Sequence, residues 1–274
     1  MRRGHFVGIS TSVAAASNTI AAALAQPDPP AKSPAVVEEN DPAIAVERPR
    51  LSTGIPAYAA IPQDATATTP GVVVVQHIYG VDDTIRDDVR RFAKEGFVTI
   101  APDLFARMDA PSGDGVTDYT VFRQYAAKLD DGGVQRDLQA AADWIRSRAH
   151  VPADARPPKV GITGFCMGGT IALRQAWANP RPYDDAAIWY GNVKNQKPDA
   201  VAIPIAGNYG ARDTSIPAAA VREFFAQLHV PHDVKIYRDA AHAFFDDTRK
   251  SYVADAAADA WSRTIAFFRK YLTV

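Results

Sequence analysis

Apolar segments alternate with amphipathic segments along most of the chain. The run GVVVVQH at residues 71–77 is continuous and rich in β-branched side chains. Such a run is typical of a strand that is buried on both faces of a parallel sheet. The next segment, residues 84–96, places Val89, Phe92 and Ala93 on one side of a helix and ends in a glycine, a common C-terminal stop. The pattern therefore predicts a strand followed by a helix.

The same alternation continues to the C-terminus. Residues 46–62 could form two short strands joined at Gly54. Further strand-like runs lie at residues 97–103, 159–166, 186–191, 201–210 and 232–240, and helical patterns at 134–149, 167–178, 217–229 and 254–272. Strands that alternate with helices indicate βαβ units. We therefore predict an α/β fold with a mostly parallel sheet and helices on both of its faces.

Residues with catalytic chemistry follow several of these strand-like runs. In a parallel sheet of this kind, functional groups gather beyond the carboxyl ends of the strands. The residues in such positions are His77, Asp103, Cys166, Asp213 and His242.

The N-terminal region has a different composition. Residues 1–25 combine a basic start, including Arg2 and Arg3, with an Ala-rich middle and small residues before Gln26. This pattern predicts a cleaved signal peptide and an exported, periplasmic protein. The arginine pair indicates the twin-arginine route, with the general secretory route left open. The alternative is an Ala-rich N-terminal helix of a cytoplasmic enzyme. Residues 26–47, rich in Pro, Ala and acidic side chains, are predicted to be a linker, and residues 48–274 a single domain.

Composition excludes several functional classes. The formal net charge is -1 and 47% of the residues are hydrophobic. A nucleic-acid-binding protein normally carries a basic footprint, so we expect no nucleic-acid partner. Beyond the leader we find no segment apolar and long enough to cross a membrane, so we expect no stable membrane insertion.

Cys166 is the only cysteine of the chain and lies in the sequence GFCMG at residues 164–168. This glycine spacing matches a nucleophile elbow, in which a strand turns sharply into a helix and exposes the nucleophile. The N-terminus of the following helix favours the thiolate, the nucleophilic form of the thiol. The alternative is a small buried cysteine beneath a glycine-rich turn.

An acid and a histidine follow the elbow in the order that a hydrolase of this type requires. Asp213 comes directly after a strand-like run, and His242 lies between the last strand and the last helix. Separately, Asp213 could cap a helix and His242 could be a surface residue. Asp239 is a rival acid, but it lies too near His242 in sequence for the usual arrangement. Together the three residues predict a Cys-His-Asp triad.

From about residue 50 to the C-terminus the chain resembles the dienelactone hydrolase family of α/β-hydrolases. The resemblance rests on the segments VVVVQHIYGVDDTIRDDVRRFAKEGFVTIAPDLFAR, KVGITGFCMGG, IWYG, GARDTSIP and YRDAAHAFF. It implies an α/β-hydrolase fold with Cys166 as nucleophile, His242 as base and Asp213 as the acid that orients it. It also implies an oxyanion hole formed by the backbone N–H groups of Ile78 and Met167.

Substrate-binding residues follow less directly. Arg107, in PDLFAR, falls where the family places an arginine that binds a substrate carboxylate, a task that suits the guanidinium fork. The alternative is a surface arginine paired with Asp103 or Asp109. We also expect the aromatic residues Tyr79, Phe105 and Tyr190 to line the pocket, although aromatics in these positions could equally belong to the core.

Two positions depart from the family pattern. His77 stands where the family usually carries a glutamate, and an imidazole there could share a proton with Cys166 or lie as a cation beside the thiolate. Asp246 stands where the family often has a second substrate-binding arginine, and a carboxylate would repel an anionic substrate. Arg249 and Lys250 are near in sequence but do not match the motif.

The expected reaction is hydrolysis of a small-molecule ester or lactone, with or without a carboxylate, through a covalent acyl-enzyme. We expect no metal or other cofactor and, by the resemblance, a monomer. Two alternatives remain open. One is a binding protein that keeps the fold without the activity, and the other is a metal site formed by Cys166, His77 and His242.

Overall fold

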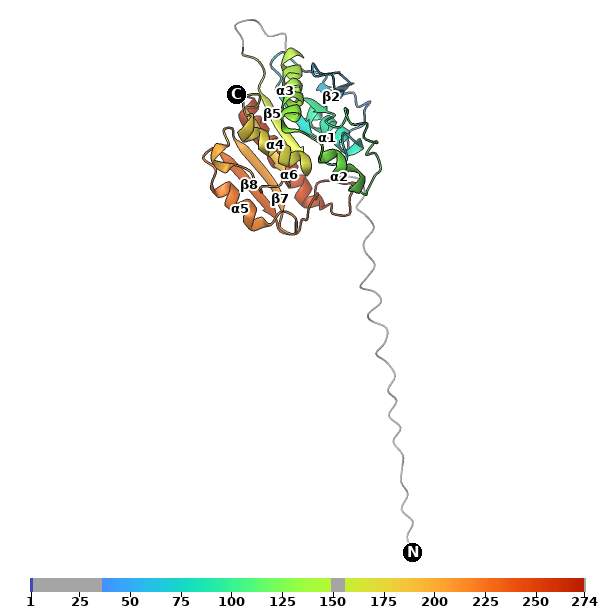
Figure 1. The fold of residues 1–274 in the computed structure, drawn as a ribbon, viewed down its shortest axis with the longest axis vertical. Helices are drawn as coiled ribbons and strands as arrows, with labels where there is room; N and C mark the ends of the chain where they lie inside the picture. The colour runs from blue at the N-terminus through green and yellow to red at the C-terminus, as the bar shows by residue number, and fades with distance from the viewer. Residues whose placement is uncertain (2–35, 149–155, 274) are drawn as a thin grey trace.

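The computed structural model describes Met1, residues 36–148 and residues 156–273. A central sheet crosses the described part of the chain, with strand order β1-β2-β4-β3-β5-β6-β7-β8 (Figure 1). β1 and β2 pair antiparallel, as do β2 and β4, and every other pairing is parallel. The strands are β1 (Ile44–Glu47), β2 (Ala57–Pro62), β3 (Gly71–Val75), β4 (Val98–Pro102), β5 (Val160–Phe165), β6 (Asp185–Trp189), β7 (Ile205–Gly210) and β8 (His232–Tyr237).

Helices cover the sheet on both faces. In the register of the sheet Gly161 of β5 lies beside Val72, one residue on from Gly71 of β3, so the two glycines face opposite sides. A Cβ at Gly71 would meet Ile145 of α3, whereas one at Gly161 would meet Phe268 of α6, so these helices lie on opposite faces. The helices are α1 (Asp83–Lys94), α2 (Thr120–Ala126), α3 (Asp131–Arg148), α4 (Met167–Ala178), the 3-10 helix η1 (Pro198–Ala200), α5 (Ala218–Ala226) and α6 (Ala254–Leu272).

The predicted mostly parallel α/β sheet is therefore confirmed, and it has the α/β-hydrolase architecture. Each of the long helical patterns corresponds to a helix, and Gly96, with φ of 95°, follows the C-cap of α1. The hydrophobic pattern does not predict α2. Of its seven residues only Phe122 is buried, so the helix has too narrow an apolar face to produce a periodic signal.

The folded domain begins earlier than residue 48, so the predicted boundary of the linker is wrong. β1 pairs with β2 from Ile44 onwards, and Val37 is buried with its N–H donated to Asp87 of α1. The Pro-rich, acidic composition indicated a solvated segment, but Val37 and Ile44 are both buried in the domain core.

The predicted leader, residues 1–25, lies outside the described residues apart from Met1 and stays a prediction. None of the described helices combines the length and the apolar character that a membrane crossing requires.

Asp185, at the start of β6, is a fully buried carboxyl group, and neither of its oxygens has a hydrogen-bond partner among the described residues. Burial raises its pKa well above the usual value, and the nearby Asp184 adds to the shift while Lys159 opposes it. A carboxyl whose pKa is higher in the folded than in the unfolded state destabilises the fold as pH rises above its unfolded value of 3.8.

We expect Asp185→Asn to remove this pH dependence. At pH 8 the variant should melt about 2–4 °C above the wild type, because its side chain is never charged. Near pH 4 the difference should vanish. Asp184→Ala is the control, since Asp184 accepts a hydrogen bond from the N–H of Val160, and the loss of that acceptor should lower the melting temperature at both pH values. If the difference in melting temperature between Asp185→Asn and the wild type is the same at pH 4 and pH 8, the prediction is wrong.

Candidate active site

Cys166 occupies a sharp turn between β5 and α4. Its backbone has φ of 56° and ψ of -114°, a strained conformation for a residue other than glycine. Two glycines make the turn possible. A Cβ at Gly164 would lie 2.3 Å from the carbonyl oxygen of Gly168, and a Cβ at Gly168 would lie 2.2 Å from that of Val75. The chain therefore forms the elbow expected from its glycine spacing.

His242 and Asp213 meet across the ends of β7 and β8. Nδ1 of His242 lies 2.6 Å from Oδ2 of Asp213. The second carboxylate oxygen of Asp213 accepts bonds from the N–H and hydroxyl groups of Ser215 and from the N–H of Ile216. This carboxylate is thus held in place from both sides. The rival, Asp239, lies exposed in an ion pair with Arg212, so the structure joins His242 to Asp213.

The electrostatics of His242 depend on both neighbours. Burial opposes protonation of the ring, but the bond to Asp213 and the contact with Cys166 outweigh it and raise the pKa of His242 to about 10. The pKa of Asp213 is lowered, because its bonds to His242 and Ser215 outweigh the effect of burial. At neutral pH the pair therefore consists of an imidazolium and a carboxylate, with Cys166 beside the ring. The positive ring complements a thiolate.

This arrangement predicts a pH-dependent stability. The pKa of His242 rises from 6.5 in the unfolded chain to about 10 in the fold. Its contribution is therefore complete below pH 6.5 and disappears as the pH rises through 10. We expect the melting temperature of the wild type to exceed that of His242→Gln at pH 6, with the difference shrinking steadily up to pH 10. If the difference in melting temperature instead grows from pH 6 to pH 10, His242 is not the protonated group that stabilises the fold.

Ile78 and Met167, the predicted oxyanion-hole residues, come from neighbouring strands. Ile78 follows β3, Met167 opens α4 directly after β5, and β3 and β5 pair in parallel. The close approach of Gly168 to Val75 brings the start of α4 against the end of β3. Both backbone N–H groups thus come from chain that flanks the elbow, as an oxyanion hole requires.

His77 is buried, and it is hydrogen-bonded to Asp82, for which the sequence motifs predict no role. Its Nε2 lies 2.7 Å from Oδ1 of Asp82, which also accepts the N–H of Ile85 and so caps α1. The imidazole packs edge-on against Tyr79. The bonded partner is therefore Asp82, not Cys166, and a role of His77 in thiol ionisation stays a prediction. The Asp-x-x-Ile start of α1 was the signal for this cap.

Arg107 is engaged by a carboxylate. Its guanidinium donates to both oxygens of the buried Asp137 and to the carbonyl of Thr53. The sequence suggested Asp103 or Asp109 as partners of a surface arginine at this position, but the observed partner is Asp137. Binding of a substrate carboxylate by Arg107 stays a prediction, and it would require the substrate to compete with Asp137.

The second departure from the family pattern has a partner of its own. Asp246 is buried and binds Nε of Arg249, whose guanidinium lies 4.2 Å from the centre of the Tyr79 ring. Arg249 does not match the family's substrate-binding motif, so the sequence pattern predicts no role for it. Only the turn at Ala243–Thr248 brings it over Tyr79, where it adds a cation–π contact.

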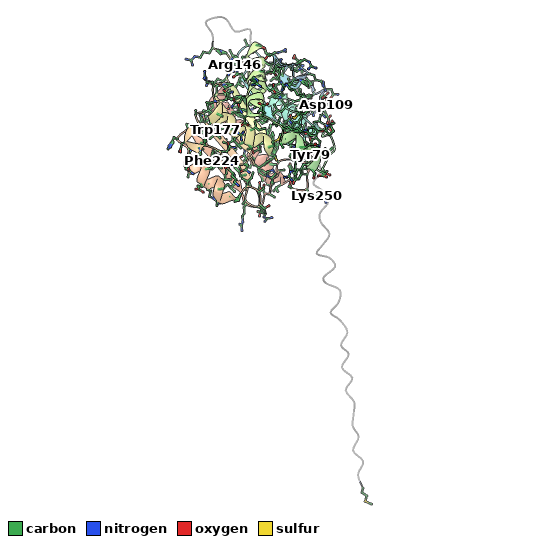
Figure 2. The ribbon with its side chains drawn as sticks, in the orientation of Figure 1. Tyr79, Asp109, Arg146, Trp177, Phe224 and Lys250 are labelled. Atoms are coloured by element: carbon green, nitrogen blue, oxygen red, sulfur yellow. The ribbon has the colours of Figure 1, made fainter. Side chains whose placement is uncertain are left out.

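The three aromatic residues predicted to line a pocket have different surroundings. The ring of Tyr190 lies 5.2 Å from that of His242 and is buried. Tyr79 and Phe105 both line a hollow of about 490 Å³, although Phe105 itself is almost fully buried and belongs equally to the core. In Figure 2, Arg146 lies near the top of the domain and Tyr79 lies lower, towards Lys250.

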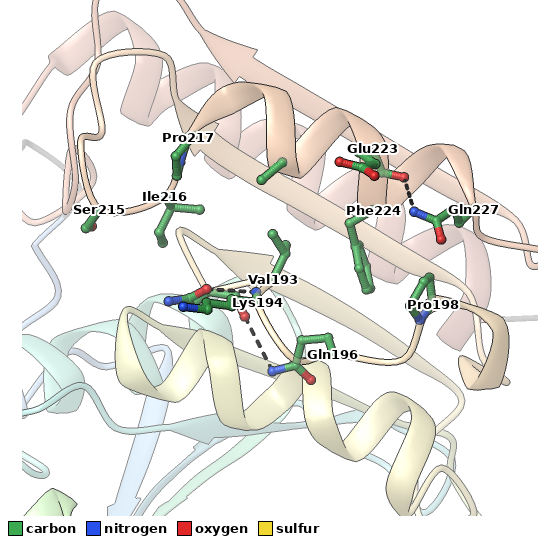
Figure 3. Close-up of a pocket in the computed structure, with 12 residues that line it drawn as sticks. Val193, Lys194, Gln196, Pro198, Ser215, Ile216, Pro217, Glu223, Phe224 and Gln227 are labelled. Atoms are coloured by element: carbon green, nitrogen blue, oxygen red, sulfur yellow. Dashed lines mark hydrogen bonds between the residues drawn. The ribbon is translucent and has the colours of Figure 1, made fainter.

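A separate groove of about 440 Å³ runs between α5 and the loop that leads from β6 to η1 (Figure 3). Ser215 lines one end of it, and the hydroxyl of Ser215 binds Asp213. None of Cys166, His242 and Asp213 lines this groove.

The alternative of a metal site receives no geometric support in the described part of the chain. There, no three His, Cys, Asp or Glu side chains are grouped as metal ligands would be. His77, one of the three residues that the alternative needs, is bonded to Asp82.

Comparison with known proteins shows the family of the chain. The model of the dienelactone hydrolase family matches residues 55–272. The chain belongs to the dienelactone hydrolase family. A relative in Escherichia coli (strain K12), named "Putative carboxymethylenebutenolidase", is 36% identical over 262 residues, which cover 88% of this chain and 94% of the relative. A relative of the same name in Yersinia pestis is 36% identical over 238 residues, covering 81% of this chain and 86% of the relative.

Solved structures of this family share the fold. A crystal structure titled "Putative Dienelactone Hydrolase", from Klebsiella pneumoniae, has 33% sequence identity and a TM-score of 0.72, covering 84% of this chain and all of that one. A dienelactone hydrolase-like promiscuous phosphotriesterase from metagenomic libraries has 23% identity and a TM-score of 0.67, which shows a common fold. The resemblance inferred from the sequence motifs is thereby confirmed.

Proposed function

We propose that this protein is a hydrolase of carboxylic esters or lactones that acts through Cys166, His242 and Asp213. One observation carries the proposal. The single thiol of the chain lies at a strained elbow beside an imidazole that a buried carboxylate holds at 2.6 Å. This is the arrangement of nucleophile, base and orienting acid that acyl transfer requires. Membership of the dienelactone hydrolase family and the names of the relatives support it.

The geometry indicates how each step would proceed. The thiolate of Cys166 attacks the carbonyl carbon, and the N–H groups of Ile78 and Met167 stabilise the oxyanion, a contribution of about 3 kcal/mol for each such donor. The C–O bond of the ester breaks as His242 gives its proton to the leaving alkoxide. The resulting neutral imidazole then takes a proton from water, the hydroxide attacks the thioester, and the thiolate leaves. Asp213 holds the ring in position throughout and stabilises its positive charge whenever the ring is protonated.

Hydrolysis of a small panel tests the proposal. The panel contains p-nitrophenyl acetate, neutral lactones and a dienelactone. Turnover of any member by the wild type, together with a covalent acyl adduct on Cys166 detected by mass spectrometry of the quenched enzyme, is the expected result. A protein that binds these compounds without turning them over would instead be the binding protein considered as an alternative. Export to the periplasm and the monomeric state stay predictions.

A further inference from the structure

Residues 77–80 form a tight turn directly after β3. The carbonyl of His77 accepts the N–H of Gly80, whose φ is 87°. This bond makes His77 and Gly80 the first and fourth residues of a β-turn, with Ile78 and Tyr79 at its centre. The turn uses the N–H of its fourth residue, and within the described residues no hydrogen bond uses the N–H of Ile78. The predicted oxyanion donor is therefore not consumed by the turn that carries it.

This turn lies against the elbow that carries Cys166. A Cβ at Gly168 would lie 2.5 Å from the carbonyl oxygen of Gln76, the residue that leads into the turn. Burial raises the pKa of Tyr79, and the charge of Cys166 adds to the shift, so the phenol and the thiol lie within electrostatic range of each other. A displacement of the turn would therefore move the N–H of Ile78 relative to the sulfur.

The side chain of His77 ties the turn to α1. Its Nε2 lies 2.7 Å from Oδ1 of Asp82, and the two side chains are only 8% and 5% exposed. The same oxygen accepts the N–H of Ile85 and caps the helix. Because a carboxylate oxygen only accepts, the proton of the shared bond lies on Nε2 of His77. A buried hydrogen bond thus connects the first residue of the turn to a rigid element.

Tyr79, on the other side of Ile78, is also held by its side chain. Its ring meets the imidazole of His77 edge-on, with the centroids 5.1 Å apart, and meets the ring of Phe122 in the same way. Its hydroxyl donates to the carbonyl of Thr117 at 3.0 Å. The side chains on both sides of Ile78 are therefore fixed, and with them the peptide group that joins His77 to Ile78.

We propose that His77 is a positioning residue, and that its bond to Asp82 orients this peptide group so that the N–H of Ile78 meets the oxyanion. The proposal deepens the proposed function and rests on it, because the oxyanion forms only when Cys166 attacks a carbonyl carbon. Tuning of the thiol would instead change the ionisation of Cys166. The oxyanion exists only near the transition state, so loss of positioning lowers kcat with little effect on KM.

Two measurements separate positioning from tuning of the thiol. Hydrolysis of the best substrate of the panel needs both the thiolate and the oxyanion hole. Alkylation of Cys166 by iodoacetamide needs the thiolate but forms no oxyanion. Because the chain contains one cysteine, the labelling rate as a function of pH reports on this thiol alone.

His77→Leu removes the donor to Asp82. We expect kcat to fall about 10²-fold, the cost of one lost oxyanion donor, while KM stays within about threefold. The labelling rate should stay within about twofold of the wild type at every pH, since the thiolate is unaffected. His77→Gln should recover most of the lost kcat, because the amide nitrogen of glutamine can donate to Asp82 in place of the imidazole.

His229→Leu is the matched control for His77→Leu. His229 also pairs with an aspartate, Asp199, but both side chains are exposed, and exposed pairs contribute little. This variant should match the wild type in kcat, KM and labelling rate.

Substitution of Asp82 tests the same bond from its other end. Asp82→Ser keeps a side chain that caps α1, but its shorter side chain no longer reaches His77, so kcat should fall as in His77→Leu. Asp82→Asn keeps an oxygen that can accept both bonds and should keep most of kcat. If its melting temperature shows that His77→Leu is not folded, Asp82→Ser carries the test.

The outcomes separate this proposal from the proposed function. A labelling rate that falls in parallel with kcat would show that His77 acts on the thiol, and the proposal would be wrong. It would be equally wrong if His77→Leu kept the wild-type kcat, or if His77→Gln lost as much kcat as His77→Leu. In each of these cases the wild type still hydrolyses its substrate. If the wild type hydrolyses no ester or lactone, the proposed function fails, and this inference with it.

Discussion

Cys166→Ala is expected to reduce ester hydrolysis by about 10⁴-fold or more, the largest effect of any single substitution in this chain. The variant removes the atom that forms the covalent intermediate, and nothing else at the elbow can replace it. In enzymes with a comparable triad, loss of the nucleophile alone costs nearly as much as loss of all its members. The check is kcat/KM with p-nitrophenyl acetate and with the best substrate of the panel.

The single cysteine allows a sharper companion experiment. Because the chain contains one thiol, labelling with iodoacetamide can modify no other cysteine. Activity should fall in proportion to the label and reach zero at one label per chain. Cys166→Ala should take up no label and should keep the melting temperature of the wild type within a few degrees, since its side chain is only partly buried. A fully labelled protein that still turns over substrate would exclude the thiol as nucleophile.

Asp213→Asn is expected to produce the second-largest loss, about 10⁴-fold in kcat. The amide has nearly the shape of the carboxylate, and its oxygen can still accept the N–H groups of Ser215 and Ile216 that now bind Asp213. The loop should therefore stay folded. The substitution removes the negative charge that lies 2.6 Å from Nδ1 of His242. In the wild type this charge raises the pKa of the ring. The ring would then lose both its fixed orientation and its proton at neutral pH.

Asp239→Asn is the matched control for this substitution. Asp239 is also an aspartate and lies closer to His242 in the sequence than Asp213 does. Its carboxylate, however, is exposed and binds Arg212. Exposed ion pairs contribute little to stability. The activity of Asp239→Asn should stay within about twofold of the wild type. The pH dependence of kcat adds a readout that a merely structural defect would not give, since the pKa of His242 should fall towards 6.5 only in Asp213→Asn. Equal losses in the two variants would contradict the assignment of the acid.

Local sequence determined the order of elements and the three residues of the candidate triad. Strands such as β3 are buried on both faces, so their β-branched runs carry an unambiguous signal. The elbow can be recognised in the sequence because the positions two residues before and two residues after Cys166 must be glycine. A Cβ at Gly164 or at Gly168 would clash with neighbouring backbone. Asp213 and His242 could be predicted because parallel strands end at the same edge of a sheet, which converts order along the chain into proximity.

Tertiary structure alone decided which charges are free and which are engaged. Arg107 is bound to Asp137, thirty residues away in the sequence, and His77 to Asp82. Arg249 lies over the ring of Tyr79, although the two residues are far apart in the sequence and belong to no common motif. An ion pair depends on where two side chains meet in space, and residue spacing in the sequence does not contain that information. The sequence by itself therefore determined the fold class and the candidate reacting groups, and only the tertiary structure decided which side chains surround them.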